Sequence, residues 1–83
     1  MDLVKINTLK DLIIEVSKEQ HDKILSYDDI NCDSTLESLG LDSLDAVEVL
    51  LLLESSFKIK LDMNFLKKSL SFAELCNLIE NAK

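Results

Sequence analysis

Apolar residues recur at helical spacing near the start of the chain. They stand at positions i, i+3, i+4 and i+7, which places them on one face of a helix: Leu9, Leu12, Ile13 and Val16. We therefore expect a first helix from about Thr8 to Glu19, capped by Asn7 or Thr8.

Three further helical segments are expected in the second half of the chain. One runs from Ser43 to Ser55 or the next residue, and a short one covers residues 62–67. The last begins at Ser71, where Ser71 and Glu74 match a capping box. The pattern predicts an all-α fold with four helices, the third of them short.

Residues 21–41, between the first two helices, show only weak periodicity. They are rich in turn-forming and capping residues such as Asp28, Asp29 and Asn31. A loop this long is unusual in a compact domain unless it is functional or well anchored. The stretch has room for a short helix, and we expect its apolar side chains to anchor it: Ile24, Tyr27, Ile30, Leu36 and Leu39.

The segment from Leu44 to Phe57 is apolar on two sides. One stripe consists of Ala46, Val49, Leu50, Leu53 and Phe57. The other stripe lies beside Glu48 and Glu54 and consists of Leu44, Val47 and Leu51. One stripe must face the core. The second indicates either a central helix covered on both sides or a docking surface for a basic, partly apolar partner, and the pattern does not choose between them.

Composition agrees with a single small helical domain. The chain has 83 residues, of which 47% are hydrophobic and 30% charged, with one Gly and no Pro. Its net charge is −7, and residues 11–54 carry twelve acids against two lysines. Such a chain repels phosphate backbones, so nucleic-acid binding is not expected, and basic protein partners are favoured.

Two cysteines give no sign of a metal or redox site. Cys32 and Cys76 form no CxxC motif and have no histidine-rich neighbourhood, so we expect free thiols and no metal. The longest unbroken apolar run, residues 49–53, is far too short to span a membrane, and no signal peptide is visible. We expect a cytoplasmic protein.

A serine stands at the expected start of the second helix. The only glycine, Gly40, lies three residues before Ser43 and permits a tight turn into the helix. Backbone N–H groups and the positive end of the helix dipole favour a phosphate at such a serine. Ser43 could also be a simple helix cap. A catalytic nucleophile is not favoured, because nothing brings the only histidine, His21, to Ser43, and we expect His21 to be an exposed loop residue.

With this serine and helix order, the chain resembles an acyl carrier protein. The motif reads LGLDSLDAVEVLLLLE, and the likeness covers nearly the whole chain. It implies one carrier domain over residues 1–83, a four-helix bundle of acyl-carrier type with a long first loop, and no enzymatic activity. It also implies that Ser43 receives 4′-phosphopantetheine from coenzyme A through a separate magnesium-dependent transferase. The thiol of that group then carries acyl groups as thioesters.

The resemblance also assigns a partner surface. Asp42 is the motif acid beside Ser43, within the surface that the transferase recognises. Leu44, Val47 and Leu51 match apolar partner contacts, and the matching acidic contacts are Asp45, Glu48 and Glu54. The partners implied are the phosphopantetheinyl transferase and acyl-loading and acyl-transfer enzymes with basic docking patches, and we expect the carrier to be a monomer.

The chain departs from common fatty-acid carriers at the end of the motif helix. Ser55 and Ser56 stand where acids are usual, and Lys58 and Lys60 follow in the next loop. Fatty-acid synthesis and a specialised acyl pathway therefore both stay open. Two other hypotheses are an aminoacyl or peptidyl carrier and an unmodified helical adaptor that uses the stripe of Leu44, Val47 and Leu51 only to bind a partner.

Overall fold

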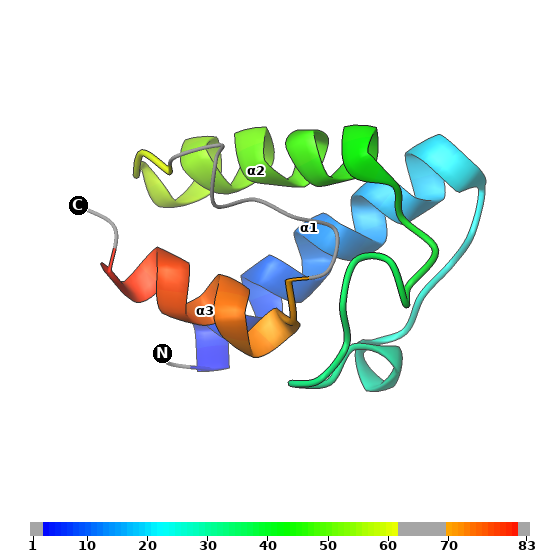
Figure 1. Ribbon diagram of the computed structural model, residues 1–83, viewed down its shortest axis with the longest axis horizontal. Coiled ribbons are helices and arrows are strands. Elements are labelled where there is room, and N and C mark those ends of the chain that lie inside the picture. Colours follow the sequence, from blue (N-terminus) through cyan, green and yellow to red (C-terminus); the bar gives the residue numbers. More distant parts are fainter. Residues whose placement is uncertain (1–2, 62–69, 82–83) are drawn as a thin grey trace.

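The computed structural model describes residues 3–61 and 70–81, and this part of the chain is helical. It contains α1 (Leu3–His21), a 3₁₀ turn η1 (Tyr27–Asp29), α2 (Ser43–Phe57) and α3 (Phe72–Asn81) (Figure 1). The described residues form no strand, only an isolated bridge between Thr35 and Ser71. The all-α prediction is confirmed. The short helix expected over residues 62–67 lies outside the described residues, so the four-helix bundle stays a prediction.

The first helix is longer than its apolar spacing indicated. It begins at Leu3 rather than near Thr8 and ends at His21 rather than Glu19. Thr8 lies inside the helix, where its hydroxyl donates to the carbonyl of Val4 at 2.9 Å. Neither Asn7 nor Thr8 is therefore a cap. The sequence signal misled because a threonine can satisfy its hydroxyl on the preceding turn as well as at a helix start.

The core lies between the three helices. Each contributes one apolar face, as expected from the spacing, and the buried side chains include Leu9, Ile13 and Val16 of α1, Ala46, Val49, Leu50 and Leu53 of α2, and Phe72, Leu75 and Ile79 of α3. Figure 1 shows the end of α1 next to the start of α2, with α3 crossing the first half of α1. The buried stripe of α2 is thus the one that begins at Ala46.

The buried side chains that anchor the loop between α1 and α2 differ in part from the expected ones. Ile30, Leu36 and Leu39 are buried as predicted, but Ile24 is 79% exposed. Asp22 adopts a left-handed conformation with φ of 52° at the end of α1, and the chain that leaves it buries Leu25 instead. The prediction for Ile24 was wrong because this break in the backbone moves the apolar register by one residue.

Tyr27 anchors the loop to α1 through polar contacts and not through burial of its side chain. It is partly exposed, and its hydroxyl donates to the carboxylate of Asp11 on α1. That hydrogen bond raises the pKa of Tyr27. The Nζ atom of Lys10 lies 5.8 Å from the centres of both the Tyr27 and Phe72 rings. The 3₁₀ turn is therefore fixed to α1 by polar contacts at the surface.

The loop then reaches the start of α3. The backbone N–H of Phe72 donates to the carbonyl of Ser34 at 2.7 Å, and that of Ala73 donates to Cys32 at 3.2 Å. These bonds satisfy two of the N–H groups that a helix start leaves unpaired. Ser71 accepts from the backbone N–H of Glu74 and completes the predicted capping box. The middle of the long loop is thus fixed to both α1 and α3.

Lys58 ends α2 in a conformation that favours glycine. It is the C-cap residue, with φ of 54°, and its N–H donates to the carbonyl of Glu54. We expect Lys58→Gly to raise the free energy of unfolding by about 1 kcal/mol, because a side chain at positive φ is strained. Lys60→Gly is the matched control: Lys60 has no positive φ, so glycine there should destabilise. Urea denaturation of both variants measures the difference, and equal effects would contradict the prediction.

Candidate functional site

Asp42 and Asp45 form a reciprocal cap at the start of α2. The Asp42 carboxylate accepts from the backbone N–H of Asp45 at 3.0 Å, and the Asp45 carboxylate accepts from the backbone N–H of Asp42 at 3.0 Å. Asp42 therefore caps the helix, and Ser43, which the sequence also allowed as a simple cap, does not. Ser43 follows as the first residue of α2, and its side chain is exposed. The helix start does not need the Ser43 hydroxyl.

Gly40 shapes the approach to this helix start. It has φ of 86°, a conformation that side chains rarely adopt, and it lies between the buried Leu39 and Leu41. Its N–H donates to the carbonyl of Glu37 at 3.0 Å. A Cβ atom at Gly40 would also lie 3.4 Å from the Nζ atom of Lys23. The turn thus lets two neighbouring leucines point into the core while the chain delivers Ser43 to the surface.

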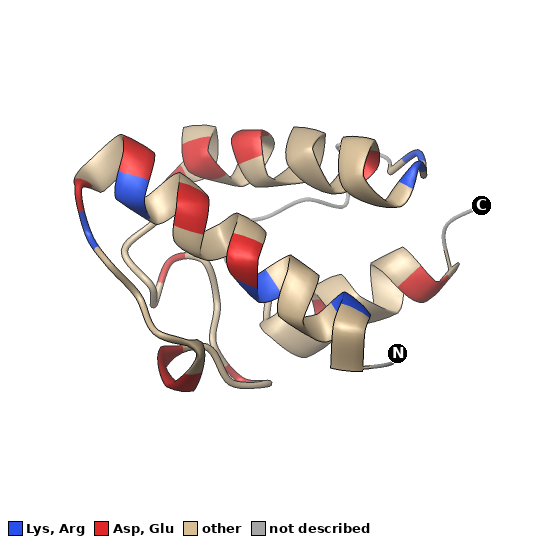
Figure 2. Ribbon diagram, turned by 180° about the vertical axis from the view of Figure 1, so that it is seen from behind, with Lys and Arg blue, Asp and Glu red and all other residues tan. Residues whose placement is uncertain are grey.

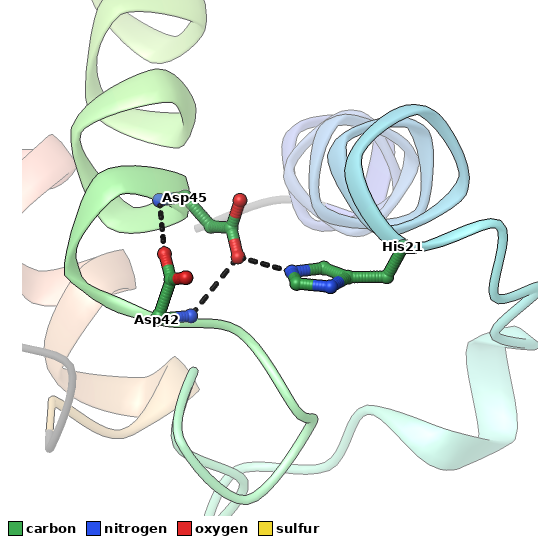
Figure 3. A group of neighbouring side chains, drawn as sticks. All are labelled: His21, Asp42 and Asp45. Carbon is green, nitrogen blue, oxygen red and sulfur yellow. Dashed lines mark hydrogen bonds and ion pairs between the residues drawn. The ribbon is translucent and has the colours of Figure 1, made fainter.

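His21 joins α1 to the start of α2. It is the last residue of α1, and its Nε2–H donates to the Oδ2 atom of Asp45 at 2.5 Å (Figure 3). The same oxygen accepts the backbone N–H of Asp42. His21 is thus exposed as expected, but it ends α1 instead of lying in the loop, and it is bonded to Asp45. The sequence gave no sign of this contact, because the two side chains are 24 positions apart and only the crossing of α1 and α2 brings them together.

Asp45 does not occupy the docking surface that the resemblance assigned to it. It is 4% exposed, and both the cap and the bond to His21 hold its carboxylate inward. Burial raises the pKa of Asp45, but the hydrogen bonds from Asp42 and His21 outweigh it, so the pKa is lowered from its ordinary value. The spacing of Asp42 and Asp45, an acid three residues after an N-cap, was the available signal for this structural role.

Replacing Asp45 with asparagine is expected to destabilise the chain at neutral pH by about 1 kcal/mol, because the charged acceptor for His21 is lost. Since the pKa of Asp45 is lowered by folding, its contribution is present above the unfolded value of about 3.9 and is lost as the pH falls through the folded value. The difference from the wild type should therefore narrow below about pH 4.

Urea unfolding of Asp45→Asn and the wild type, from about pH 7 down to about pH 3, measures this pH dependence. Asp33→Asn is a suitable control, since Asp33 is exposed and its carboxylate is in no hydrogen bond with the described residues. A stability difference for Asp45→Asn that stays constant over the whole range would contradict the assignment.

The outer face of α2 exposes apolar side chains to solvent. Leu44 is 80% exposed and Leu51 is 53% exposed, while Val47 and Glu48 between them are partly exposed. The stripe of Leu44, Val47 and Leu51 is therefore a surface feature. Of the two interpretations that the sequence left open, a helix covered on both sides does not fit these exposures. An exposed apolar row of this kind is typical of a protein-binding site.

Glu54 is bonded to the chain that follows α2. It is partly buried, and its carboxylate accepts from the backbone N–H of Leu61 at 3.0 Å, which fixes the chain that follows α2. Of the three acids that the resemblance placed on the partner surface, only Glu48 makes no hydrogen bond or ion pair with the described residues. Helical spacing could not predict the bond between Glu54 and Leu61, because Leu61 lies beyond the end of α2.

The side chains of His21, Asp42 and Asp45 could together hold a cation. One ligand atom from each lies within 4.8 Å of the others, a set that the sequence did not indicate. The hydrogen bonds among these residues use the same Asp45 oxygen that an ion would need. In the structure the cluster acts as a hydrogen-bond network that orients the start of α2.

The two cysteines lie at the other end of the molecule. Both are free and line a cavity of about 570 Å³ between α1, the long loop and α3, together with residues such as Lys10 and Phe72. Cys32 is exposed and Cys76 partly buried. Burial raises the pKa of the Cys76 thiol, so it is not an activated nucleophile. No residue of α2 lines this cavity, which is therefore separate from Ser43.

Fold and site together define a small helical domain that presents a free serine hydroxyl at a helix start, beside an exposed apolar row. A family model described as a phosphopantetheine attachment site matches residues 7–79. Comparison with curated proteins found no significant match, and neither did comparison with solved structures. Because the family match spans most of the chain, this chain belongs to the phosphopantetheine attachment-site family.

Members of this family are carriers, not enzymes, and hold 4′-phosphopantetheine covalently. The start of α2 fits such a group. The cap is supplied by Asp42, so the exposed Ser43 hydroxyl is available, and the N–H groups of the first turn favour a phosphodiester. Among the described helices, none is long and apolar enough to cross a membrane.

Proposed function

We propose that this chain is an acyl carrier protein in which Ser43 is the point of phosphopantetheine attachment. The observation that carries this proposal is that Asp42 and Ser43 have different roles at the start of α2. Asp42 caps the helix, which leaves the neighbouring Ser43 exposed and without a structural task. The bound group would supply a flexible thiol that holds acyl groups as thioesters.

The chain itself has three tasks in this function. It presents the Ser43 hydroxyl, holds it still through the cap of Asp42 and Asp45, and offers a surface that partners recognise. Its only histidine, His21, donates to Asp45, and no hydrogen bond among the described residues joins it to Ser43. The phosphopantetheinyl transferase would therefore supply the base.

The partner surface that we propose is smaller than the one assigned from the resemblance. It consists of Leu44, Val47, Glu48 and Leu51, with Asp42 next to the attachment point. It excludes the buried Asp45 and also Glu54, whose carboxylate is bonded to the backbone of Leu61. Acyl-loading and acyl-transfer enzymes with apolar docking patches would bind it. We propose a monomeric carrier of the cytoplasm, in fatty-acid synthesis or a specialised acyl pathway. Leu41 and Asp42 before the serine favour acyl over aminoacyl or peptidyl cargo.

The exposure of Leu44 and Leu51 also supports the second candidate function, an unmodified adaptor that only binds a partner. The two candidates differ in covalent chemistry. The test is to incubate the chain with coenzyme A and a phosphopantetheinyl transferase, and then with a fatty acid, ATP and an acyl carrier protein ligase. A carrier gains first the prosthetic group and then a hydroxylamine-labile acyl group. An adaptor gains neither, and that result would overturn the proposal.

A further inference from the structure

The outer face of α2 changes its charge along its length. At the start of the helix lie the exposed Asp42 and the partly exposed Glu48, and just beyond its end lie the exposed Lys58 and Lys60 (Figure 2). No described residue forms an ion pair with either lysine. Between these ends, Ser55 and Ser56 are exposed and uncharged. The surface is therefore anionic beside Ser43 and cationic at the far end.

The internal bonds of α2 sharpen this difference. The partly buried carboxylate of Glu54, the acid of α2 that is closest in sequence to the two lysines, accepts from the backbone N–H of Leu61 and is thereby held against the chain that follows α2. At the other end, the bond from His21 to Asp45 leaves the exposed Asp42 carboxylate and Glu48 as acids that a partner can reach. The accessible charge of the face thus reverses between its two ends.

The cationic end follows directly after the helix that carries the apolar row. Leu44 and Leu51 are seven residues apart, which is two helical turns, so they lie along the same side of α2, and Lys58 is the C-cap residue at its end. A partner that covers both leucines and extends past the end of α2 therefore reaches Lys58. Ser43 and Lys58 are roughly 20 Å apart along the helix, a span that one protein docking patch easily covers.

Resting on the proposed function, we infer that the cognate partner of this carrier has a docking patch of two charges. It has an apolar socket for Leu44 and Leu51, a basic group opposite Asp42 and Glu48, and an acidic group opposite Lys58 and Lys60. A partner whose patch is basic throughout pairs with the start of α2 but is repelled at its end. Lys58 and Lys60 thus weaken the binding of such enzymes.

The experiment measures how tightly the unmodified chain binds a fatty-acid acyl-transfer enzyme whose docking patch is basic along its whole length. Binding at low ionic strength is followed by fluorescence anisotropy of the labelled chain. Lys58→Glu, and separately Lys60→Glu, should each lower the Kd about fivefold, since repulsion becomes attraction. The gain should vanish at high salt. Two variants are used because Lys58 ends the helix and Lys60 does not.

Lys18→Glu is the matched control, because it changes the net charge by the same amount at an exposed residue of α1. It should leave the Kd nearly unchanged. The inference would be overturned if Lys18→Glu and Lys58→Glu changed the Kd equally. It would also be overturned if neither Lys58→Glu nor Lys60→Glu changed the Kd. Loading of Ser43 is measured separately by intact mass, so failure of the proposed function shows as a missing prosthetic group, whatever the Kd values are.

Discussion

A Ser43→Ala variant is expected to lose all phosphopantetheine loading and to keep its fold. The loss should be complete because the phosphodiester needs the Ser43 oxygen and alanine has none. The fold should survive because the helix cap is made by Asp42 and Asp45, and the Ser43 side chain is exposed. Its free energy of unfolding should change by less than about 0.5 kcal/mol. Intact mass after incubation with transferase, together with urea denaturation, measures both quantities.

Ser56→Ala is the control for that variant. Ser56 is another exposed serine on α2, so its replacement makes the same chemical change on the same helix away from the cap. It should load as fast as the wild type. Loading of Ser43→Ala, or a loss of stability as large as the loss of a cap (about 1 kcal/mol), would show that the division of roles between Asp42 and Ser43 is wrong.

Replacing Leu53 with alanine is expected to lower the free energy of unfolding by about 3 kcal/mol, which is the cost of a buried cavity of this kind. Leu53 is fully buried in the core beside residues of α1 and α3. A domain of this size has a small stability margin, so the variant should be partly unfolded under mild denaturing conditions. Chemical denaturation followed by circular dichroism gives the value.

Leu51→Ala provides the comparison on the same helix. Leu51 is 53% exposed, so its truncation should cost less than about 1 kcal/mol of stability while weakening partner binding. The pair separates the two faces of α2. Similar losses of stability for Leu51→Ala and Leu53→Ala would mean that the outer stripe is buried, which would contradict both the fold description and the docking surface.

The sequence predicted the elements that depend on local chemistry. α2 begins at Ser43 as expected, because the acid before it and the glycine turn are local signals. The capping box at Ser71 and Glu74 is confirmed for the same reason. The buried stripes of α1 and α2 also follow directly from helical spacing.

What the sequence did not predict depends on contacts between distant segments. His21 and Asp45 meet only because α1 crosses the start of α2, and Glu54 has a backbone partner only because Leu61 returns to it. The exposure of Ile24 follows from a single left-handed residue at the end of α1, which no pattern of apolar residues reveals. Family resemblance placed Asp45 on the partner surface, since it transfers positions but not side-chain orientation.

These corrections change which residues a partner can recognise. With Asp45 buried and Glu54 bonded to Leu61, recognition in the proposed function would rest on the apolar row from Leu44 to Leu51 and on few accessible charges. Electrostatic contacts then contribute mostly to selecting a partner, and the leucines contribute most of the affinity. A carrier with such a surface is suited to a narrower set of enzymes than one that is acidic along all of α2.

The most direct test of the central claim is the intact mass of the wild-type chain before and after incubation with coenzyme A and a broad-specificity phosphopantetheinyl transferase, followed by peptide mapping. The account predicts a gain of one phosphopantetheine per chain, located on the peptide that contains Ser43. A folded chain that gains no mass, or that carries the group on another residue, would contradict it.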